Sequence, residues 1–226
     1  MPQVTLPGLP PVTVHLRRSA RARRLSLRVS QLDGRVTLTM PDYADESEAL
    51  AFAETKADWV RKHLARRPED ETVGIGTVLP VEGQLRRVVE HKARGVELTA
   101  DEIRVSARSG ARRIRAFLIE LARDRLTAAS DRYAAQLGRG YNSLALRDTR
   151  SRWGSCSDGG RLMYSWRLVM APVEVLEYVA AHEVAHLKEM NHSAAFWSEV
   201  ERLYGPYDVE RRWLRENAGA LHRFRF

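Results

Sequence analysis

The sequence predicts a mixed α+β protein of two domains, a β-rich N-terminal domain with one helix over residues 1–108 and a second domain over residues 109–226. Three observations support this prediction. Apolar residues alternate with polar ones in two stretches of the first half, they recur at spacings of three and four in another, and several longer helical patterns fill the second half. A chain of 226 residues is long enough for one or two such domains.

The N-terminal domain begins with a predicted β-hairpin over residues 25–40, in which strand-like alternation is interrupted by a turn at Asp33-Gly34. A surface helix is predicted next, between Asp45 and Arg67, because its apolar positions follow a helical period. Residues 75–106 alternate again, with Gly83 and Gly95 as turn points, and predict short strands.

The second domain opens with a long predicted helix that Ser109-Gly110 introduces and that Gly138 and Gly140 end. Two strands are predicted next, over residues 144–149 and 161–169, on either side of a glycine-bearing turn at 157–160.

Three further helices are predicted in the last part of the chain. Pro172 suits the first turn of a helix that runs through Met190. Ser193 is a good N-cap for a second helix, which Gly205-Pro206 ends, and Asp208 caps a last helix.

Composition favours a cytoplasmic protein that does not enter a membrane. The chain is 44% hydrophobic, and no apolar run approaches the roughly 18 residues that span a bilayer. The first residues lack the pattern of a secretory signal, and the single cysteine, Cys156, agrees with a reducing compartment. The net charge of +8 owes much to arginines between residues 17 and 28, which suit either a nucleic acid or simply a solvated strand face.

The segment HEVAHLKEMNH, residues 182–192, contains the residue types of a catalytic metal site. His182 and His186 are four residues apart and so lie on one face of the predicted helix. Glu183 points slightly off that face and can act as general base on a metal-bound water. A catalytic zinc takes three protein ligands, and His192 is the best candidate for the third. We expect one Zn²⁺ per chain, although another divalent ion would suit the same ligands.

Two other interpretations of this segment are weaker. The match can be a coincidence on an amphipathic helix, but His192 and the helical context make that the weaker interpretation. A structural zinc site normally has four ligands and is rich in cysteine, whereas this chain has only Cys156. Cys156 is also a poor candidate for a nucleophile, because the nearby histidines are already assigned to the metal.

The stretch RWGSCSDGGRLMYSWRLVMAP, which leads into EYVAAHEVAHLKEMNHSAAFWSEV, resembles the YgjP-like family of metal-dependent hydrolases. This family is a zincin branch related to the SprT and WLM proteins, and RRSARARRLSLRV and KADWVRKHLARR resemble its N-terminal region. The resemblance implies a zincin-like catalytic domain with its metal-binding helix packed on a small sheet, zinc on His182, His186 and His192, and Glu183 as base. Metzincins share the histidine spacing but have glycine where this chain has Glu189, so Asn191 is expected to supply a left-handed turn.

Three residues outside the histidine segment are candidates for substrate binding. Arg152, in the family-like motif Arg152–Cys156, suits either stabilisation of negative charge on a substrate or a bracing role. The strand 161–169, with Tyr164 and Trp166, suits either an edge strand that binds an extended peptide or an ordinary core strand. Phe196, Trp197 and Trp213 are expected to be core aromatics.

These observations predict a zinc-dependent hydrolase of the metallopeptidase type, in which Glu183 activates the metal-bound water and a peptide or protein is the substrate. The first alternative is a metal-dependent nucleoside triphosphate pyrophosphatase, which needs Arg or Lys side chains that converge near the metal. The second is a nucleic-acid-associated protease of the SprT-like type, with the basic N-terminal domain as its docking surface.

Overall fold

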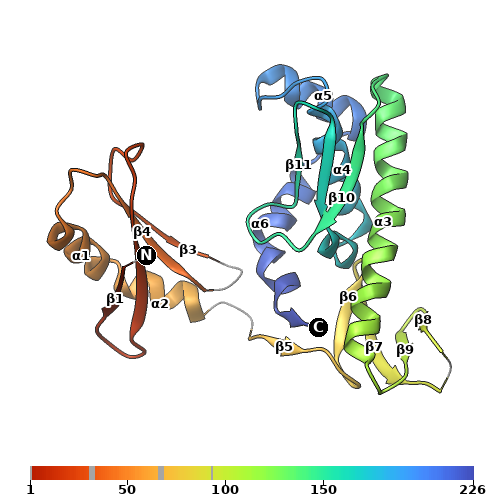
Figure 1. Ribbon diagram of the computed structural model, residues 1–226, viewed down its shortest axis with the longest axis horizontal. Coiled ribbons are helices and arrows are strands. Elements are labelled where there is room, and N and C mark those ends of the chain that lie inside the picture. Colours follow the sequence, from red (N-terminus) through yellow and green to blue (C-terminus); the bar gives the residue numbers. More distant parts are fainter. Residues whose placement is uncertain (1, 31–33, 66–68, 93) are drawn as a thin grey trace. The chain divides into compact units, whose positions relative to one another are not determined.

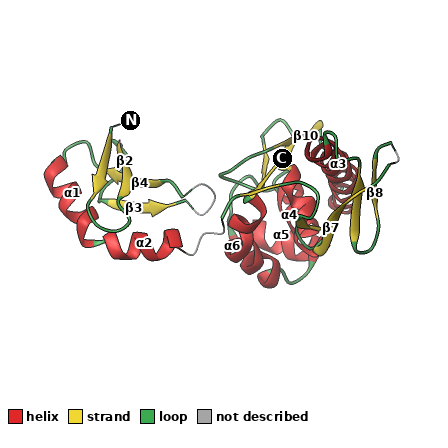
Figure 2. Ribbon diagram, turned by 90° about the horizontal axis from the view of Figure 1, so that it is seen from below, coloured by secondary structure: helices red, strands yellow, loops and turns green. Residues whose placement is uncertain are grey.

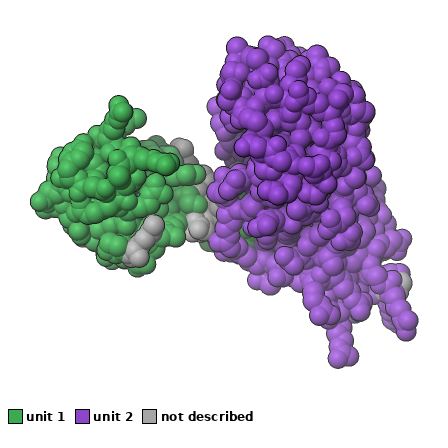
Figure 3. All heavy atoms as spheres, turned by 45° about the horizontal axis from the view of Figure 1, so that its top comes forward, with its two compact units in different colours: residues 1–69, 218–223 green, residues 70–217, 224–226 purple. Residues whose placement is uncertain are grey.

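A computed structural model describes residues 2–30, 34–65, 69–92 and 94–226, and the chain in it forms two compact units. Unit 1 contains residues 1–69 and 218–223, and unit 2 contains residues 70–217 and 224–226 (Figure 3). The units divide near residue 70, whereas the expected domain boundary lies near residue 108. Because a compact unit need not be a domain that folds alone, the division into 1–108 and 109–226 stays a prediction.

Unit 1 is a four-stranded sheet in the order β1-β2-β4-β3. Its strands are β1 (Gln3–Leu6), β2 (Val12–Arg18), β3 (Ser26–Val29) and β4 (Val36–Met40). The predicted pairing of residues 25–40 is confirmed, since β3 and β4 are antiparallel with Val29 opposite Val36. Asp33, in the predicted turn, lies outside the described residues, whereas Gly34 has a positive φ of 69°. β2 and β4 are parallel and therefore require the long connection between them.

Two helices, α1 (Glu46–Thr55) and α2 (Ala57–Ala65), replace the single helix predicted over residues 45–67. The Asp45 side chain caps α1 by accepting from the Ser47 backbone N–H at 2.6 Å. Lys56 then leaves helical geometry at φ −104° and ψ 4°, which separates the two helices. The apolar residues keep a helical spacing across this break because α1 and α2 both pack on the same side of the sheet (Figure 2). Ala49, Ala53 and Val60 are fully buried there.

The arginines of residues 17–28 are all exposed in unit 1. Arg18 donates hydrogen bonds from Nη1 to the carbonyls of Asp42 and Ala44, at 2.9 and 3.0 Å, and thereby holds the segment that leads into α1. This contact fits the interpretation of a solvated strand face, and a nucleic-acid partner for unit 1 stays a prediction.

Unit 2 contains the short strands expected over residues 75–106, which form a sheet in the order β6-β7-β9-β8. They are β6 (Val78–Val81), β7 (Gln84–Glu90), β8 (Val96–Leu98) and β9 (Glu102–Val105). Gly83 and Gly95 have φ of 76° and 99° at the two predicted turns, a conformation that favours glycine. A separate parallel pair joins β5 (Glu71–Thr72) to β13 (Phe224–Arg225).

Helix α3 (Gly110–Leu137) extends alongside the four-stranded sheet and a further, three-stranded sheet of unit 2 (Figure 1). It confirms the long helix predicted after Ser109-Gly110. Gly138 ends it with φ 72°, and its N–H bonds to carbonyls of the last turn. One face of α3 is buried against the rest of unit 2, including Ile114, Leu118 and Leu126, each with no exposed surface.

The second sheet of unit 2 has the order β10-β12-β11 and lies against α4 (Figure 1). Its strands are β10 (Ser143–Arg147), β11 (Gly154–Cys156) and β12 (Arg161–Ser165). β12 pairs in parallel with β10 and antiparallel with β11, so it is the central strand and not the edge strand considered for peptide binding. It also ends earlier than predicted, because Trp166–Met170 form a 3₁₀ helix. β11 was not predicted.

Three α-helices complete the chain: α4 (Val173–Ala185), α5 (Ala194–Tyr204) and α6 (Asp208–His222). Their starts agree with the predictions, and the Ser193 hydroxyl caps α5 by accepting from the Phe196 N–H at 3.4 Å. The helices and sheets of the two units confirm the mixed α+β class. Within the described part of the chain, no helix combines the length and the apolar character that crossing a bilayer requires.

Candidate metal centre

Helix α4 carries His182 and Glu183 in its last turn and ends earlier than expected. Its last residue is Ala185, and His186 follows as C-cap, whereas the sequence pattern extended the helix to Met190. The N–H groups of Leu187 and Lys188 bond to the carbonyls of Val184 and Ala185, three residues back, at 2.9 and 3.0 Å. Hydrogen bonds to the third residue back wind the end of the helix more tightly than α-helical ones. The α-helix therefore ends at the second histidine.

The three histidines of the segment converge. Nε2 of His182 and Nε2 of His192 are 3.2 Å apart, and the ring centroids of His186 and His192 are 4.8 Å apart. One ligand nitrogen from each ring can be chosen such that all three lie within 4.8 Å of one another. This is the spacing that three ligands of one ion require, and no other group of three or more His, Cys, Asp or Glu side chains in the described residues meets it.

The turn after α4 positions the second and third histidines without a glycine. Nδ1 of His186 lies 2.9 Å from the Glu189 carbonyl oxygen, a contact that orients the ring and leaves Nε2 as the nitrogen for a metal. Asn191 does not adopt the expected left-handed conformation, since Glu82 and Ser109 are the non-glycine residues with positive φ in the described chain. Instead, its side-chain oxygen accepts from the Ser193 N–H at 3.0 Å and starts the turn into α5.

Aromatic side chains from α5 pack against the histidine rings. Phe196 is fully buried, stacks on His186 with ring centroids 4.3 Å apart, and has its edge toward His182 and His192 at 4.9 and 4.8 Å. The Trp197 ring lies 5.6 Å from both of these last two. Phe196 is therefore a core aromatic, as expected, whereas Trp197 and Trp213 are only partly buried. Phe196 and Trp197 together form one wall of the histidine cluster.

The electrostatics of the cluster favour neutral imidazoles. Burial, together with the neighbouring His186 and His192, lowers the pKa of His182 to about 3. Burial also lowers the pKa of His186. A neutral ring has a free lone pair at neutral pH, which is the form that binds a metal.

Glu183 is 6% exposed and lies on the sheet side of α4. Burial raises its pKa to about 8, and the positive charge of Arg152 opposes that rise. The carboxyl lies directly against β11, where a Cβ atom added to Gly154 would be 2.5 Å from both Cγ and Oε1 of Glu183. A buried carboxyl with a pKa near neutrality has the character of a general base.

The other candidate residues are placed differently. Arg152 is exposed and its charge reaches Glu183. Tyr164 has no exposed surface, and its hydroxyl lies 3.1 Å from the Ser130 hydroxyl of α3. Trp166 is 2% exposed and lies beneath the Arg167 guanidinium, at 4.7 Å from Cζ to the ring centroid. The structure therefore places these two aromatics in the core of unit 2, where a substrate would not touch them.

Cys156 follows Gly154 on β11 and is half-buried. Burial raises the pKa of its thiol to about 11, and the negative charges of Glu183 and Asp158 add to the rise. A thiol with so high a pKa is a weak nucleophile at neutral pH, which agrees with the expectation that Cys156 is not one.

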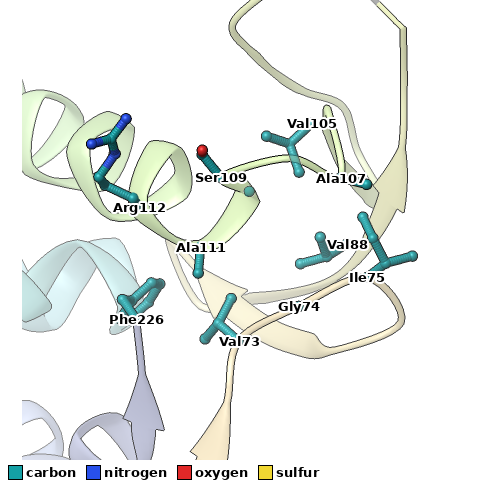
Figure 4. Close-up of a pocket in the computed structure, with 11 residues that line it drawn as sticks. Val73, Gly74, Ile75, Val88, Val105, Ala107, Ser109, Ala111, Arg112 and Phe226 are labelled. Carbon is teal, nitrogen blue, oxygen red and sulfur yellow. The ribbon is translucent and has the colours of Figure 1, made fainter.

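Two hollows lie in this part of unit 2, and the first of them has His186 of the cluster in its lining. One of about 600 Å³ is bordered by His186, Leu187, Met190, Asn142 and Ser157. The other, of about 550 Å³, shares Ser157 with it and runs over β10, β11 and β12, with four arginine side chains in its lining: Arg147, Arg150, Arg152 and Arg161. A third hollow, of about 570 Å³, lies where the first turn of α3 meets Val73, Val88 and Phe226, and the side chains around it are mainly aliphatic (Figure 4).

Three features of the site were missed in the sequence. Gly154 makes room for Glu183, Phe196 supports all three histidines, and the Arg211 guanidinium lies over the Trp197 ring, with Cζ 4.9 Å from its centroid. The motif that contains Gly154 was visible, but a glycine shows its function only when the side chain it accommodates is known. The contacts of Phe196 and Arg211 join separate helices, and the sequence has no local signal for them.

The donor set fits a divalent metal. Three imidazoles lie within reach of one ion, one of them is oriented by a backbone carbonyl, and an acidic side chain is adjacent without being one of the three. Three nitrogen ligands and no thiolate are typical of an open catalytic zinc site, whereas closed structural sites have four ligands.

A comparison with known protein families agrees with this chemistry. The sequence model of a family described as "YgjP-like, metallopeptidase domain" matches residues 23–217. Among curated proteins none matches the chain. Two solved structures are similar to part of it, the metallopeptidase zymogens abylysin of Pyrococcus abyssi and jannalysin of Methanocaldococcus jannaschii. The first has 22% identity and a TM-score of 0.36 over 41% of this chain and 92% of its own, and the second has 18% and 0.35 over 42% and 96%.

Proposed function

The chain belongs to the YgjP-like metallopeptidase family, and on this premise we propose that it is a zinc-dependent peptidase with His182, His186 and His192 as metal ligands and Glu183 as general base. The observation that carries the proposal is the convergence of three imidazoles within 4.8 Å, with a buried carboxyl on the residue that follows the first of them. When bound, the metal supplies Lewis-acid chemistry, which polarises the scissile carbonyl and makes water more acidic.

The protein groups have separate tasks in this proposal. Glu183 accepts a proton from the attacking water at a carboxylate oxygen and later donates it to the leaving amine. Its burial supports both steps, because a raised pKa lets the carboxyl hold the proton between them. Arg152, the exposed cation whose charge reaches Glu183, is placed to stabilise negative charge that develops on the substrate.

The substrate that fits this arrangement is an extended peptide. β11 is an edge strand of its sheet, and Gly154 within it touches Glu183. A peptide that added to this edge by main-chain hydrogen bonds would run past the carboxyl, so β11 takes the role that was considered for residues 161–169. The hollow beside His186 and Met190 would then accept one substrate side chain.

The test of the proposal is Glu183→Gln, which keeps the shape of the side chain and removes its basicity. We expect this variant to bind one zinc per chain, as the wild type does, and to lose peptidase turnover by several orders of magnitude. Zinc is measured by elemental analysis and turnover with casein and a quenched peptide library. Glu189→Gln, a carboxylate change on the same segment, is the matched control and should keep activity. An active Glu183→Gln enzyme would refute the assignment.

A second candidate function is hydrolysis of a nucleoside triphosphate, and the four arginines around one hollow favour it. Guanidinium groups that converge near a metal are suited to phosphate oxygens. The two functions are separated by assaying the same zinc-loaded protein with casein and with a panel of nucleoside triphosphates. Arg147 and Arg161 lie farther from Gly154 than Arg152 does. The substitutions Arg147→Gln and Arg161→Gln should therefore raise KM for a triphosphate and leave peptide hydrolysis unchanged.

A further inference from the structure

Gly154 and Glu183 are in closer contact than any other residue at position 154 would allow. A Cβ atom at Gly154 would lie 2.5 Å from Cγ, 2.5 Å from Oε1 and 2.7 Å from Cδ of Glu183. Carbon atoms pack at about 3.5–4.0 Å, so an added methyl group would overlap the carboxyl along most of its length. The acidic side chain thus rests on bare backbone.

The glycine is required for space and not for its backbone conformation. Gly154 is absent from the glycines of positive φ in the described chain, and it pairs with Tyr164 in regular antiparallel register. An alanine could adopt that backbone without strain. The consequence of a methyl group at position 154 therefore depends on what it touches, and its three nearest atoms all belong to Glu183.

Neither backbone can retreat to relieve the overlap. On one side, β11 is held by its pairing with the central strand and by the hydrogen bond from the Ser165 N–H to the Trp153 carbonyl, at 2.8 Å. On the other, Val184 and Ala185 of α4 are fully buried, so the helix is packed on the faces around Glu183. The side chain of Glu183 is the part that would have to move.

From this contact we propose that Gly154 is a positioning residue for the general base. The RWGSC segment then serves to place a residue that has no side chain against the catalytic carboxyl. The proposal rests on the proposed function of Glu183. It explains why the edge strand β11 begins with a glycine, a residue that strands generally disfavour. β11 would then have two roles at one residue, since it both aims the carboxyl and borders the path of the substrate.

The kinetic test is Gly154→Ala. Misplacing a catalytic group by about 1 Å can cost on the order of 100-fold in rate, so we expect kcat to fall at least about 100-fold. KM should change much less, and zinc content should stay at one per chain, because the three atoms nearest to the added methyl group belong to Glu183 and to none of the histidines. The matched control is Gly74→Ala, elsewhere in unit 2, where an added Cβ would have no atom within 4 Å. Gly154→Ala with wild-type kcat would overturn the proposal.

A second test does not depend on activity. Gly154→Ala should lower the midpoint of thermal unfolding when Glu183 is present and should lower it much less in a Glu183→Ala background, where the overlapping side chain is gone. Equal shifts in the two backgrounds would overturn the proposal. The outcome is independent of the proposed function: an active Glu183→Gln enzyme refutes the catalytic role of Glu183 while the coupling between positions 154 and 183 persists. Conversely, absent coupling with an inactive Glu183→Gln enzyme refutes only the positioning role.

Discussion

At the scale of single residues, the three histidines are held by different means. His182 lies within α4 and His186 at its C-cap, so the helix fixes both, and the Glu189 carbonyl orients the second ring further. His192 is exposed and comes from the turn before α5. Its position depends on Asn191, on the Ser193 cap and on the aromatic wall of Phe196 and Trp197. Among the three proposed ligands, His192 is therefore the one whose placement depends most on the packing of a second helix.

Cys156 offers a pH-dependent test of the site at residue scale. Because burial raises the pKa of this thiol to about 11, only on the order of 0.1% of it is thiolate at pH 8, and alkylation in the folded protein should be slow. The rate should rise about tenfold per pH unit up to the region of pH 10. A thiol pKa that is higher in the folded than in the unfolded chain stabilises the fold below the unfolded value of 9.0 and loses that effect as the pH rises through 11.

The alkylation rate is measured by mass spectrometry with iodoacetamide, and the urea-unfolded chain, with the same cysteine exposed, is the control. Rapid alkylation of the folded protein at pH 8 would contradict the buried environment. Cys156→Ser should keep peptidase activity, because the thiol has no part in the proposed chemistry.

At the scale of elements, helix α4, which carries His182 and Glu183, packs against β11 on one side and against α3 and α5 on others. The link between α3 and the sheet includes a buried hydrogen bond between the hydroxyls of Ser130 and Tyr164, both fully buried. Tyr164 therefore connects the long helix to the central strand. Its contribution belongs to the stability of unit 2.

Tyr164→Phe tests this structural role against substrate binding. The variant leaves the Ser130 hydroxyl buried without its partner, so the free energy of unfolding should fall by about 1–3 kcal/mol, while KM for peptides should not change. Denaturant unfolding and steady-state kinetics measure the two effects. In the double variant with Ser130→Ala, the loss should be smaller than the sum of the two single losses. A raised KM with unchanged stability would instead place Tyr164 in contact with substrate.

The elements that the sequence predicted well are those with a long period or a clear cap. The start of α5 at Ser193, the end of α3 at Gly138 and the hairpin turns at Gly83 and Gly95 all follow from local chemistry. The break at Lys56 and the end of α4 at Ala185 have no glycine or proline to announce them. Strand β11 has three residues, too few for an alternation to show, and the central place of β12 depends on pairing that only the tertiary fold decides.

The candidate site, too, was predictable where its residues are close in sequence and not where they meet only in the fold. The three histidines and Glu183 were identifiable as candidates because they share one short segment, and the structure brings the histidines together. The contact between Gly154 and Glu183 joins positions 29 residues apart in sequence and could not be read from either. Tyr164 and Trp166 looked equally suited to a core or to an edge strand, and burial in unit 2 decided for the core.

At the scale of the whole molecule, the histidine cluster lies entirely within unit 2, and the end of the chain is tied into the same unit. β13 pairs with β5, the Phe226 ring meets the edge of Trp166 with centroids 5.5 Å apart, and Arg167 donates to the Phe224 carbonyl at 3.2 Å. A metal that binds the cluster should accordingly stabilise unit 2 as a whole.

Removal and return of metal test this expectation. A ligand that binds only the folded state at 100 times its Kd adds about 2.7 kcal/mol of stability, so zinc should raise the unfolding midpoint of the chelator-treated protein measurably. Differential scanning calorimetry with and without zinc gives the shift. His192→Ala should abolish most of it, whereas His91→Ala, a histidine that lies near Glu97 on the other sheet of unit 2, should not. An equal zinc shift in both variants would exclude the three-histidine centre.

The hydrogen-bond partner of His186 has a consequence for how this protein can change over evolutionary time. The acceptor is the main-chain oxygen at position 189, which every amino acid supplies, so the orientation of the ring does not depend on the identity of residue 189. Mutations that alter this glutamate should therefore accumulate as neutral variation among descendants of the chain. Position 154, where only hydrogen fits, has no comparable freedom, and lineages that retain Glu183 as a base should retain that glycine with it.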